Sequence, residues 1–469
     1  MGKIFTNKKS WIFFFIVIIT YTILKLGSVN YSYSDENAYF YMGKLVSEGL
    51  IPYKDFFFSH PPLQIVLFAI MYKIAGFNFF LLKFSSTIAI IISAFFLFKL
   101  VKKIFDGIAP LISVILFLFS YDSLRFSSYP LGVDLATMFI VIGFYYLLAE
   151  KKIFLSGIFF GFAGITGVYS LIPALIIIIF LLIKDRKIFL KFLLGFSLIF
   201  AAINIIFLTI SYNEFVTQAF KYHLMKPNDK ENKIEIFLRI IEINFLLFLA
   251  AFSYFFFKDK KIQLVWIVSL AYILFLFLLK KIFSYYFMLA FPLLAVLGGF
   301  GIASIYNRVR INKNILLIFL AALLILTSAW GVNRYIKYDF QDFDNAEEIA
   351  DYIKSNSAKE DTIFGDDSIT PLIALLSDRR IALNFADSNS LRFRSGVTDI
   401  NKVISELKKN NNKFVIDYKL KVENLIGRNG PSYMDEFSNY LDKECKIVKS
   451  FSQRLNQYER IIDVYDCLR

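Results

Sequence analysis

Residues 11–39, WIFFFIVIITYTILKLGSVNYSYSDENAY, decide the class of fold that this chain can adopt. The run begins with an apolar stretch that is long enough to cross a bilayer, for which roughly 17–25 residues are needed. It ends with two adjacent carboxylates, Asp35 and Glu36. Ionisable groups so close to hydrocarbon are costly, and membrane proteins keep them mostly for function. The stretch therefore predicts a transmembrane helix that leads into a functional loop.

The composition extends this interpretation to most of the chain. Of the 469 residues, 57% are hydrophobic and 56 are Phe, which is typical of a polytopic α-helical membrane protein. The first apolar run has no small-residue cleavage site, so we interpret it as a retained span rather than a signal peptide. Hydropathy predicts about 11 transmembrane helices. They fall near residues 11–29, 79–101, 107–121, 130–149, 153–166, 168–183, 188–210, 240–257, 262–279, 285–305 and 313–332.

The net charge of +14 sets the orientation and does not indicate nucleic-acid binding. Most Lys and Arg residues lie in short loops between apolar runs, and placing these loops in the cytoplasm satisfies the positive-inside rule. The protein is then expected in the plasma membrane with the first loop, residues 30–78, outside. The acid pair and both histidines, His60 and His223, fall on this outer face. Within the loop, Leu63–Ile74 is too short to span and is expected to lie on the membrane surface.

The chain becomes polar after the last predicted span. Strand-like segments at Thr362–Phe364 and Lys413–Tyr418 alternate with helical segments at Thr370–Leu376 and Val397–Asn410. This alternation predicts a small extracytoplasmic α/β domain at 333–469, after a transmembrane domain at 1–332.

The two cysteines, Cys445 and Cys467, lie in this C-terminal segment, and their spacing fits no zinc motif. They flank two short apolar-alternating runs that are expected to pair as strands. A disulfide would suit an outer domain. The sequence leaves open whether they form one or remain two free thiols.

Several cations lie outside, where the positive-inside rule disfavours them. They are Arg125, Lys221, Lys226, Lys280 and Lys281. One interpretation is an ordinary exception, since Lys at a helix C-terminus interacts well with the helix dipole. The other is that they bind an anion at the membrane surface, such as a lipid phosphate.

Short motifs in the outer loops resemble the GT-C superfamily of membrane glycosyltransferases, in particular the family 39 branch of protein O-mannosyltransferases and the aminoarabinose transferase of lipid A. The motifs are the Asp35-Glu36 pair after the first span, Gly49-Leu-Ile-Pro-Tyr-Lys-Asp55, His60-Pro-Pro-Leu63, Tyr129-Pro-Leu-Gly-Val-Asp134 and Lys280-Lys-Ile-Phe-Ser-Tyr-Tyr286. The outer domain after the last span is also similar.

The resemblance implies an inverting transfer of a hexose or pentose from a polyprenyl-phosphate donor to an extracytoplasmic protein, lipid or glycan. Asp35 maps to the family's catalytic base, with Glu36 in a supporting role, and Asp134 maps to its second acid. Asp134 also has a plain structural interpretation, as an acid stabilised by a helix N-terminus.

The donor phosphate is expected to contact His60, His223, Lys221, Lys280, Lys281 and Arg125, and the substrate pocket to include Tyr53, Asp55, Tyr285 and Tyr286. The aminoarabinose-transferase relatives have Lys where this chain has His60, and Glu at the position of Ser59. These changes weaken the case for lysine-type charge pairing and for a metal site at Ser59. We expect no required cofactor.

Two alternatives remain at the level of sequence. An oligosaccharyltransferase or ligase would use a diphosphate-linked donor and a divalent metal, for which Asp35, Asp55 and Asp134 are available. A transporter or flippase of lipid-linked sugars would show charges at mid-membrane and repeated halves. The sequence has few such charges and no evident repeat.

Overall fold

The computed structural model describes residues 7–227, 232–309, 312–338, 343–410, 412–422, 425–428, 430–455 and 458–467. The chain forms two compact units. The helical unit comprises Met1–Val29, Lys83–Ile206 and Asp229–Phe340, and the sheet unit comprises Asn30–Leu82, Phe207–Asn228 and Gln341–Arg469. Most of the first loop therefore folds with the C-terminal segment. The division into domains at 1–332 and 333–469 stays a prediction.

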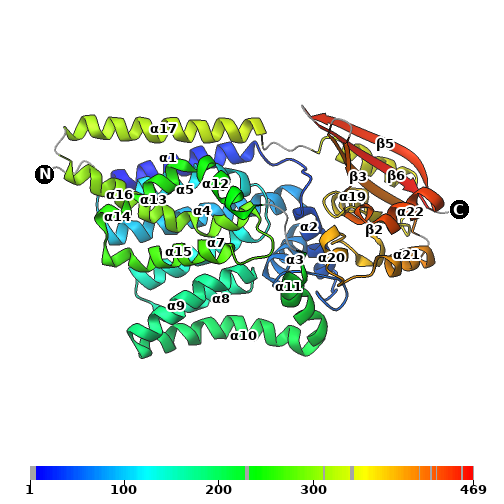
Figure 1. Ribbon diagram of the computed structural model, residues 1–469, viewed down its shortest axis with the longest axis horizontal. Coiled ribbons are helices and arrows are strands. Elements are labelled where there is room, and N and C mark those ends of the chain that lie inside the picture. The colour runs from blue at the N-terminus through cyan, green and yellow to red at the C-terminus, as the bar shows by residue number, and fades with distance from the viewer. Residues whose placement is uncertain are drawn as a thin grey trace. The chain divides into compact units, whose positions relative to one another are not determined.

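The helical unit is built almost entirely from apolar helices that pack against one another. Helices α5 and α13 both contact α16, α7 contacts α8, and α9 contacts α15 (Figure 1). The α-helices that lie wholly or mainly in this unit are α1 (Asn7–Leu26), α4 (Phe79–Ile104), α5 (Ala109–Leu118), α6 (Tyr121–Phe126), α7 (Val133–Phe144), α8 (Ile153–Gly164), α9 (Leu171–Lys184), α10 (Arg186–Val216), α12 (Lys233–Ile243), α13 (Phe245–Phe252), α14 (Tyr254–Phe257), α15 (Gln263–Leu276), α16 (Phe291–Arg308) and α17 (Lys313–Tyr338).

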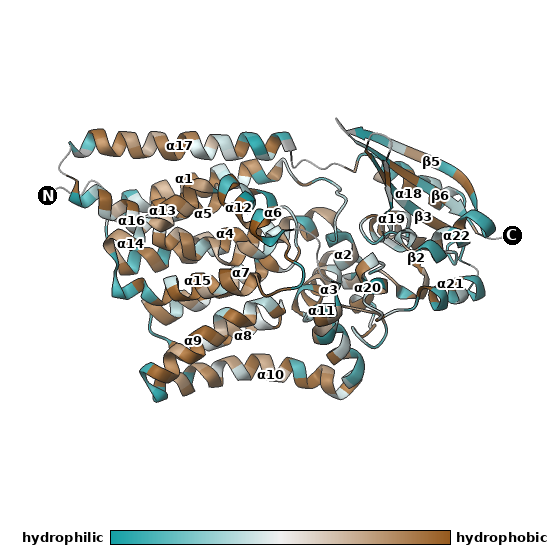
Figure 2. Cartoon of the chain, in the orientation of Figure 1, coloured by the Kyte–Doolittle hydropathy of each residue, from teal (hydrophilic) through white to brown (hydrophobic). Residues whose placement is uncertain are grey.

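Many of these helices expose apolar side chains along their length, as the brown colouring of α10 and α17 in Figure 2 shows. In the described part of the chain, four helices are long and apolar enough to cross a membrane: Lys8–Leu26, Phe79–Ile104, Arg186–Met225 and Asn314–Lys337. A fifth is added if the bent pair α12–α13 counts as one span. Several others are shorter apolar helices of 10–17 residues. The polytopic helical architecture is confirmed, and the count of eleven spans stays a prediction.

The sheet unit contains a six-stranded mixed sheet with helices around it. The strand order is β2-β1-β3-β6-β5, with β4 paired to β3; β1 is parallel to β2 and β3, while β6 is antiparallel to β3 and β5. The strands are β1 (Thr362–Gly365), β2 (Arg380–Ile381), β3 (Phe414–Val422), β4 (Leu425–Arg428), β5 (Lys446–Leu455) and β6 (Tyr458–Asp466). The helices are α2 (Glu36–Ser47), α3 (Leu63–Ala75), α11 (Tyr222–Met225), α18 (Ala346–Ser355), α19 (Thr370–Ser377), α20 (Ser390–Arg394), α21 (Ile400–Lys409) and α22 (Asp435–Glu444).

The predicted α/β elements agree with this sheet. The expected strands correspond to β1 and β3, the expected helices to α19 and α21, and the apolar runs between the cysteines to β5 and β6. Cys445 and Cys467 form a disulfide beside the β5–β6 pair. The choice that the sequence left open is thus settled in favour of the bridge.

Helix α2 connects the first loop to the rest of the sheet unit. It packs against α3 and α19, and Gly43 permits the close approach to α3, because a Cβ there would lie 2.5 Å from the Phe68 Cβ. The segment after α10 also belongs here. Ser211 breaks the helical geometry of α10 (φ −154°, ψ 66°), after which the chain runs through a π-turn at Thr217–Lys221 into α11.

Candidate functional site

The two adjacent acids of the first loop have different surroundings. Glu36, the first residue of α2, is fully buried and accepts a 2.5 Å hydrogen bond from the Ser32 hydroxyl. Asp35, which precedes the helix, is only half-buried. A buried, hydrogen-bonded carboxylate is suited to holding a loop in shape, whereas a part-exposed one can meet a substrate. Asp35 is therefore the more exposed acid of the pair.

The turn that carries Asp35 is fastened to the loop after β1. The Ser368 carbonyl accepts hydrogen bonds from the Ser34 backbone N–H at 3.3 Å and from the Asn37 amide at 2.6 Å. The same Asn37 side chain donates to the Ser32 carbonyl at 2.7 Å. Long-range contacts of this kind fix a reactive side chain more firmly than a loop could alone.

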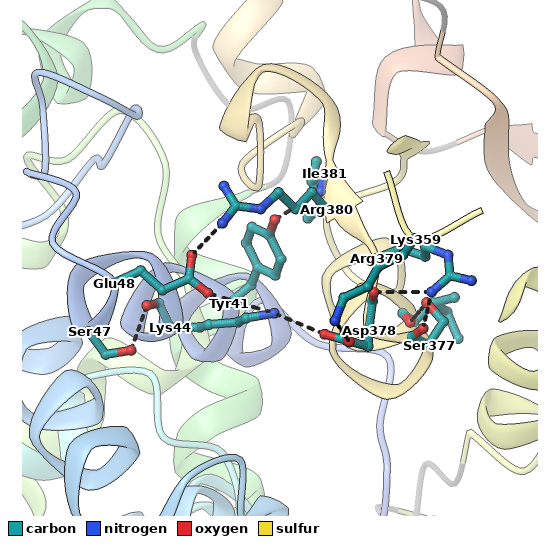
Figure 3. A network of polar contacts seen from close by, with 11 residues as sticks. Tyr41, Lys44, Ser47, Glu48, Lys359, Ser377, Asp378, Arg379, Arg380 and Ile381 are labelled. Carbon is teal, nitrogen blue, oxygen red and sulfur yellow. Dashed lines mark hydrogen bonds and ion pairs between the residues drawn. The ribbon is translucent and has the colours of Figure 1, made fainter. Parts of the chain in front are cut away.

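A second set of contacts, drawn in Figure 3, holds the other end of α2. The Ile381 N–H donates to the Tyr41 hydroxyl at 2.8 Å, and Arg380 lies 3.2 Å from Glu48. Lys44 lies 3.9 Å from Asp378, which follows α19. Ion pairs with this exposure contribute little individually. The buried Tyr41 bond and the α2–α19 packing carry the attachment.

Two further acids, Asp366 and Asp367, lie near the Asp35 turn, and sequence reasoning missed them. Asp366 and Asp367 follow β1 directly and are 2% and 7% exposed. Burial, with Asp417 and Asp35 nearby, raises the pKa of Asp366 to about 6. Burial, followed by the charges of Asp366, Asp35 and Asp387, raises the pKa of Asp367 well above its usual value. The available signal was an acid pair directly after a predicted strand, since polar groups at the carboxyl ends of parallel strands often form sites.

Arg392 is the cation that accompanies these acids. Its guanidinium lies between the Phe57 and Phe385 rings, 4.0 and 3.7 Å from their centroids. Burial lowers the pKa of Arg392 to about 10, with Asp387 opposing the shift, so the side chain remains charged at neutral pH. The local sequence of Arg392 does not indicate this position, because the Phe57 ring comes from the distant first loop, although Phe385 is only seven residues away.

The structure brings the two histidines together. The His60 and His223 ring centroids are 5.5 Å apart, and Nε2 of His223 donates to the Ser59 carbonyl at 2.7 Å in the tautomer that carries a proton there. Burial, followed by the proximity of His223 and Lys226, lowers the pKa of His60 well below its usual value. His60 is therefore neutral near pH 7 and offers a hydrogen bond rather than a charge.

The segment after the α10 kink braces the loop that leads to His60. Gln218 donates to the Tyr53 carbonyl at 3.0 Å and accepts from the Phe58 N–H at 2.9 Å. The Tyr53 hydroxyl in turn donates to the His60 carbonyl at 2.7 Å. Tyr53 is buried in a left-handed conformation (φ 70°), which a bulky residue adopts at a cost of about 1–3 kcal/mol and only when its surroundings enforce it.

The other sequence-predicted residues of this unit lie on its surface. Lys221 is exposed in the π-turn. Asp55 is also exposed, and its carboxylate accepts a 2.7 Å hydrogen bond from the Ile51 N–H. Asp55 and Tyr53 both line a cavity of about 450 Å³ within the unit.

The remaining predicted residues belong to the helical unit. Asp134 is buried in the first turn of α7, after Gly132 in a left-handed conformation (φ 86°). Tyr285 and the buried Tyr286 lie in a 3₁₀ turn, Ser284–Leu289, with their ring centroids 4.9 Å apart. Lys281 stacks on Phe283 and Arg125 on Phe126, with distances of 5.2 and 5.1 Å to the ring centroids, while Lys280 is exposed.

Among the described residues, no group of three or more His, Cys, Asp or Glu side chains is arranged to hold a metal ion. Asp35, Asp55 and Asp134, the acids considered for a metal on sequence grounds, do not form such a group there.

Comparisons with known proteins give one match to a family model and several matches to solved structures. The model of glycosyltransferase family 87 matches residues 57–235, which is less than half of the chain and does not include Asp35. No curated protein matches the chain by sequence. The chain is similar in structure to ArnT from Cupriavidus metallidurans bound to undecaprenyl phosphate (TM-score 0.67, 11% identity, 98% of each chain covered).

Two other solved structures are also similar. One is the Archaeoglobus fulgidus oligosaccharyltransferase tethered to an acceptor peptide (TM-score 0.57, 13% identity, covering 87% of this chain and 69% of that one). The other is the mycobacterial arabinofuranosyltransferase AftD (TM-score 0.54, 9% identity, covering 100% and 40%). At identities this low, the matches establish the fold and nothing more. The protein is an integral membrane protein that shares the fold of these solved structures.

Proposed function

We propose that this protein is an inverting glycosyltransferase that moves a hexose or pentose from a polyprenyl-phosphate donor to an extracytoplasmic acceptor, with Asp35 as the general base. The observation that carries the proposal is the contrast between buried Glu36 and half-buried Asp35 on a turn fastened to the β1 loop. It gives one positioned carboxylate that a substrate hydroxyl can approach.

In this mechanism Asp35 takes the proton of an acceptor hydroxyl. The acceptor oxygen then forms a bond to the anomeric carbon as the bond from that carbon to the phosphate oxygen breaks. The polyprenyl phosphate leaves with the bonding electron pair, and the anomeric configuration inverts. A single carboxylate is sufficient for such a displacement, whereas a retaining double displacement would call for a second one as nucleophile.

The leaving phosphate gains charge during this step and needs donors or cations to stabilise it. In the sheet unit, Lys226 lies close enough to His60 and Asp387 to affect the pKa of both. Lys226, with the neutral rings of His60 and His223 beside it, thus forms the group that we assign to the phosphate, and Lys221 is a peripheral member. Contributions from Arg125, Asp134, Lys280 and Lys281 to donor binding stay predictions from the sequence.

The donor class is supported by what the similar structures contain. The structure of ArnT holds undecaprenyl phosphate, and that of AglB from Archaeoglobus fulgidus holds dolichol phosphate with an inhibitory peptide. We accordingly propose a lipid-phosphate donor and an acceptor on the outer face of the plasma membrane. The likeness to oligosaccharyltransferases keeps one alternative in view, a diphosphate-linked donor with a divalent metal.

The test is sugar transfer by the purified full-length protein from a panel of radiolabelled donors, each with and without a chelator. The panel contains polyprenyl-phosphate and polyprenyl-diphosphate sugars. We expect turnover of a monophosphate donor that survives chelation, and a product of inverted configuration by NMR. Exclusive use of a diphosphate donor, loss of activity with chelator, or a retained configuration would contradict the proposal.

A further inference from the structure

The sheet unit contains a cavity of about 450 Å³ that the proposed chemistry does not use. Three segments far apart in sequence form its walls: residues 53–57 of the first loop, residues 213–218 after the α10 kink, and residues 383–398 around α20. Sites for small molecules usually occupy about 300–1,000 Å³ and are formed where separate segments converge. The size and construction of this cavity are those of a ligand site.

The lining is polar and balanced in charge. Lys54 and Arg392 are its cations, and Asp55 and Glu214 are its acids. Three carboxamides and two hydroxyls add both donors and acceptors, from Asn213, Gln218, Asn384, Thr217 and Thr398. A phosphate or carboxylate ligand would favour an excess of cations, which is absent from this lining. A sugar hydroxyl both donates and accepts, so this mixture suits a neutral polyol.

Arg392 gives the cavity a rigid wall. In addition to its two stacked rings, its Nε donates to the Thr398 hydroxyl at 2.8 Å and its Nη1 donates to the Asp387 carbonyl at 2.7 Å. A guanidinium that is stacked on both faces and bonded at its edge loses little freedom when a ligand arrives.

The backbone around the cavity adopts rare conformations. Six non-glycine residues in the described part of the chain have positive φ, and three of them line this cavity: Tyr53 (70°), Leu383 (59°) and Asn384 (53°). Such conformations tend to gather at ligand sites, where surrounding structure enforces them. The three residues lie in two of the three walls. Their conformations are an observation separate from the polar character of the lining.

We propose that this cavity binds an uncharged, hydroxyl-rich glycan, and that it is the acceptor subsite of the transferase. The second part rests on the proposed function, and the first part does not. The 213–218 wall lies beyond the Ser211 break in α10. The other two walls come from the first loop and from residues 383–398 around α20. A glycan that reaches the protein from the aqueous side would meet these segments.

The test blocks the cavity with a covalent plug. Both cysteines of the chain are in the disulfide, so a new cysteine is the only free thiol. Asn213→Cys, at an exposed lining position, is labelled with a bulky maleimide. Tyr212→Cys, its exposed neighbour outside the lining, is the matched control, and Val397→Cys on another wall is a second plug.

Binding is measured by saturation-transfer NMR on the full-length protein in a detergent without a sugar headgroup. The probes are maltose, cellobiose, lactose and mannobiose, with galacturonate and inorganic phosphate as anionic comparisons. We expect saturation of at least one neutral disaccharide by the wild type and by labelled Tyr212→Cys, and only background with both plugged variants. Absence of any neutral signal from folded protein, a signal that survives both plugs, or a preference for the anions would overturn the proposal.

Hydrolysis of the polyprenyl-phosphate donor by water, followed in the same samples, separates this inference from the proposed function. We expect the plug to abolish transfer to a glycan while donor hydrolysis continues. Transfer at the wild-type rate by plugged protein would refute the acceptor subsite and leave the transferase standing. If no sample turned over any donor, the proposed function would fail, and the disaccharide data would still decide whether the cavity binds glycans.

Discussion

Replacement of Gln218 by Ala tests whether the segment after the α10 kink holds the first loop in place. The amide of Gln218 makes two hydrogen bonds to backbone groups of that loop, at the Tyr53 carbonyl and the Phe58 N–H. Both loop residues are buried, so water would replace the lost hydrogen bonds to the Tyr53 carbonyl and the Phe58 N–H only poorly. The expected loss is about 1–3 kcal/mol in the local opening free energy of the loop. This corresponds to roughly 5- to 150-fold faster exchange of the Phe58 amide hydrogen.

The assay is hydrogen–deuterium exchange by mass spectrometry on peptides that cover residues 53–60, with a β3 peptide as internal reference. Gln218→Glu is the informative second variant. Its carboxylate still accepts from the Phe58 N–H but opposes the Tyr53 carbonyl, so Phe58 should stay protected while the thermal stability falls. Lys221→Ala, at an exposed position one turn later, should change neither. Wild-type exchange at Phe58 in Gln218→Ala would refute the bracing role.

Three further outcomes are expected from thermal unfolding in detergent. The Lys419 ammonium lies 2.5 Å from the Asp463 carboxylate and 3.3 Å from that of Asp417. Lys419→Met removes the cation from both and should lower the free energy of unfolding by about 3–5 kcal/mol; an unchanged Tm would contradict this. Burial lowers the pKa of His60, so the unfolded state binds a proton that the folded state does not. His60 should therefore make stability fall below about pH 6.5 by at most about 1.4 kcal/mol per pH unit. Burial also lowers the pKa of His223 to about 3, so His60→Asn should reduce the slope without abolishing it; an equally steep profile would contradict this. Serine in place of both Cys445 and Cys467 opens a loop with a sequence separation of 22 and should lower stability by up to about 3 kcal/mol, whereas a small effect would mean that the β5–β6 pairing already closes it.

Local patterns in the sequence were sufficient for the secondary structure of the sheet unit. The amphipathic spacing of 397–410 predicts α21, and the apolar alternation around the cysteines predicts β5 and β6. The elements of the first loop could be predicted in the same way, because their signals lie within a few residues of one another. These signals are the acid pair, the turn residues and Pro61-Pro62 at the start of α3. The two histidines were also placed together correctly, since both were assigned to loops on one face.

Contacts between distant segments could not be predicted in this way. Asp366 and Asp367 belong to the Asp35 environment because the loop after β1 is bonded to the turn before α2. Arg392 stacks on the ring of Phe57 from the first loop as well as on that of nearby Phe385, and no short motif encodes the contact with Phe57. The number of spans is difficult for a related reason, since several apolar helices have only 10–17 residues and hydropathy alone does not distinguish a short span from a buried helix.

The central claim is that Asp35 is the base and that Glu36 is structural. The most direct measurement is the initial rate of sugar transfer by Asp35→Asn and Glu36→Gln, each normalised to folded protein. Asparagine preserves the shape of the side chain but cannot take a proton, so Asp35→Asn should lower transfer by about 10²–10⁴-fold with little change in Tm. Glu36→Gln should instead lower the Tm and leave turnover per folded molecule near the wild-type value. Near-normal transfer by Asp35→Asn, or its loss in a well-folded Glu36→Gln, would contradict the account.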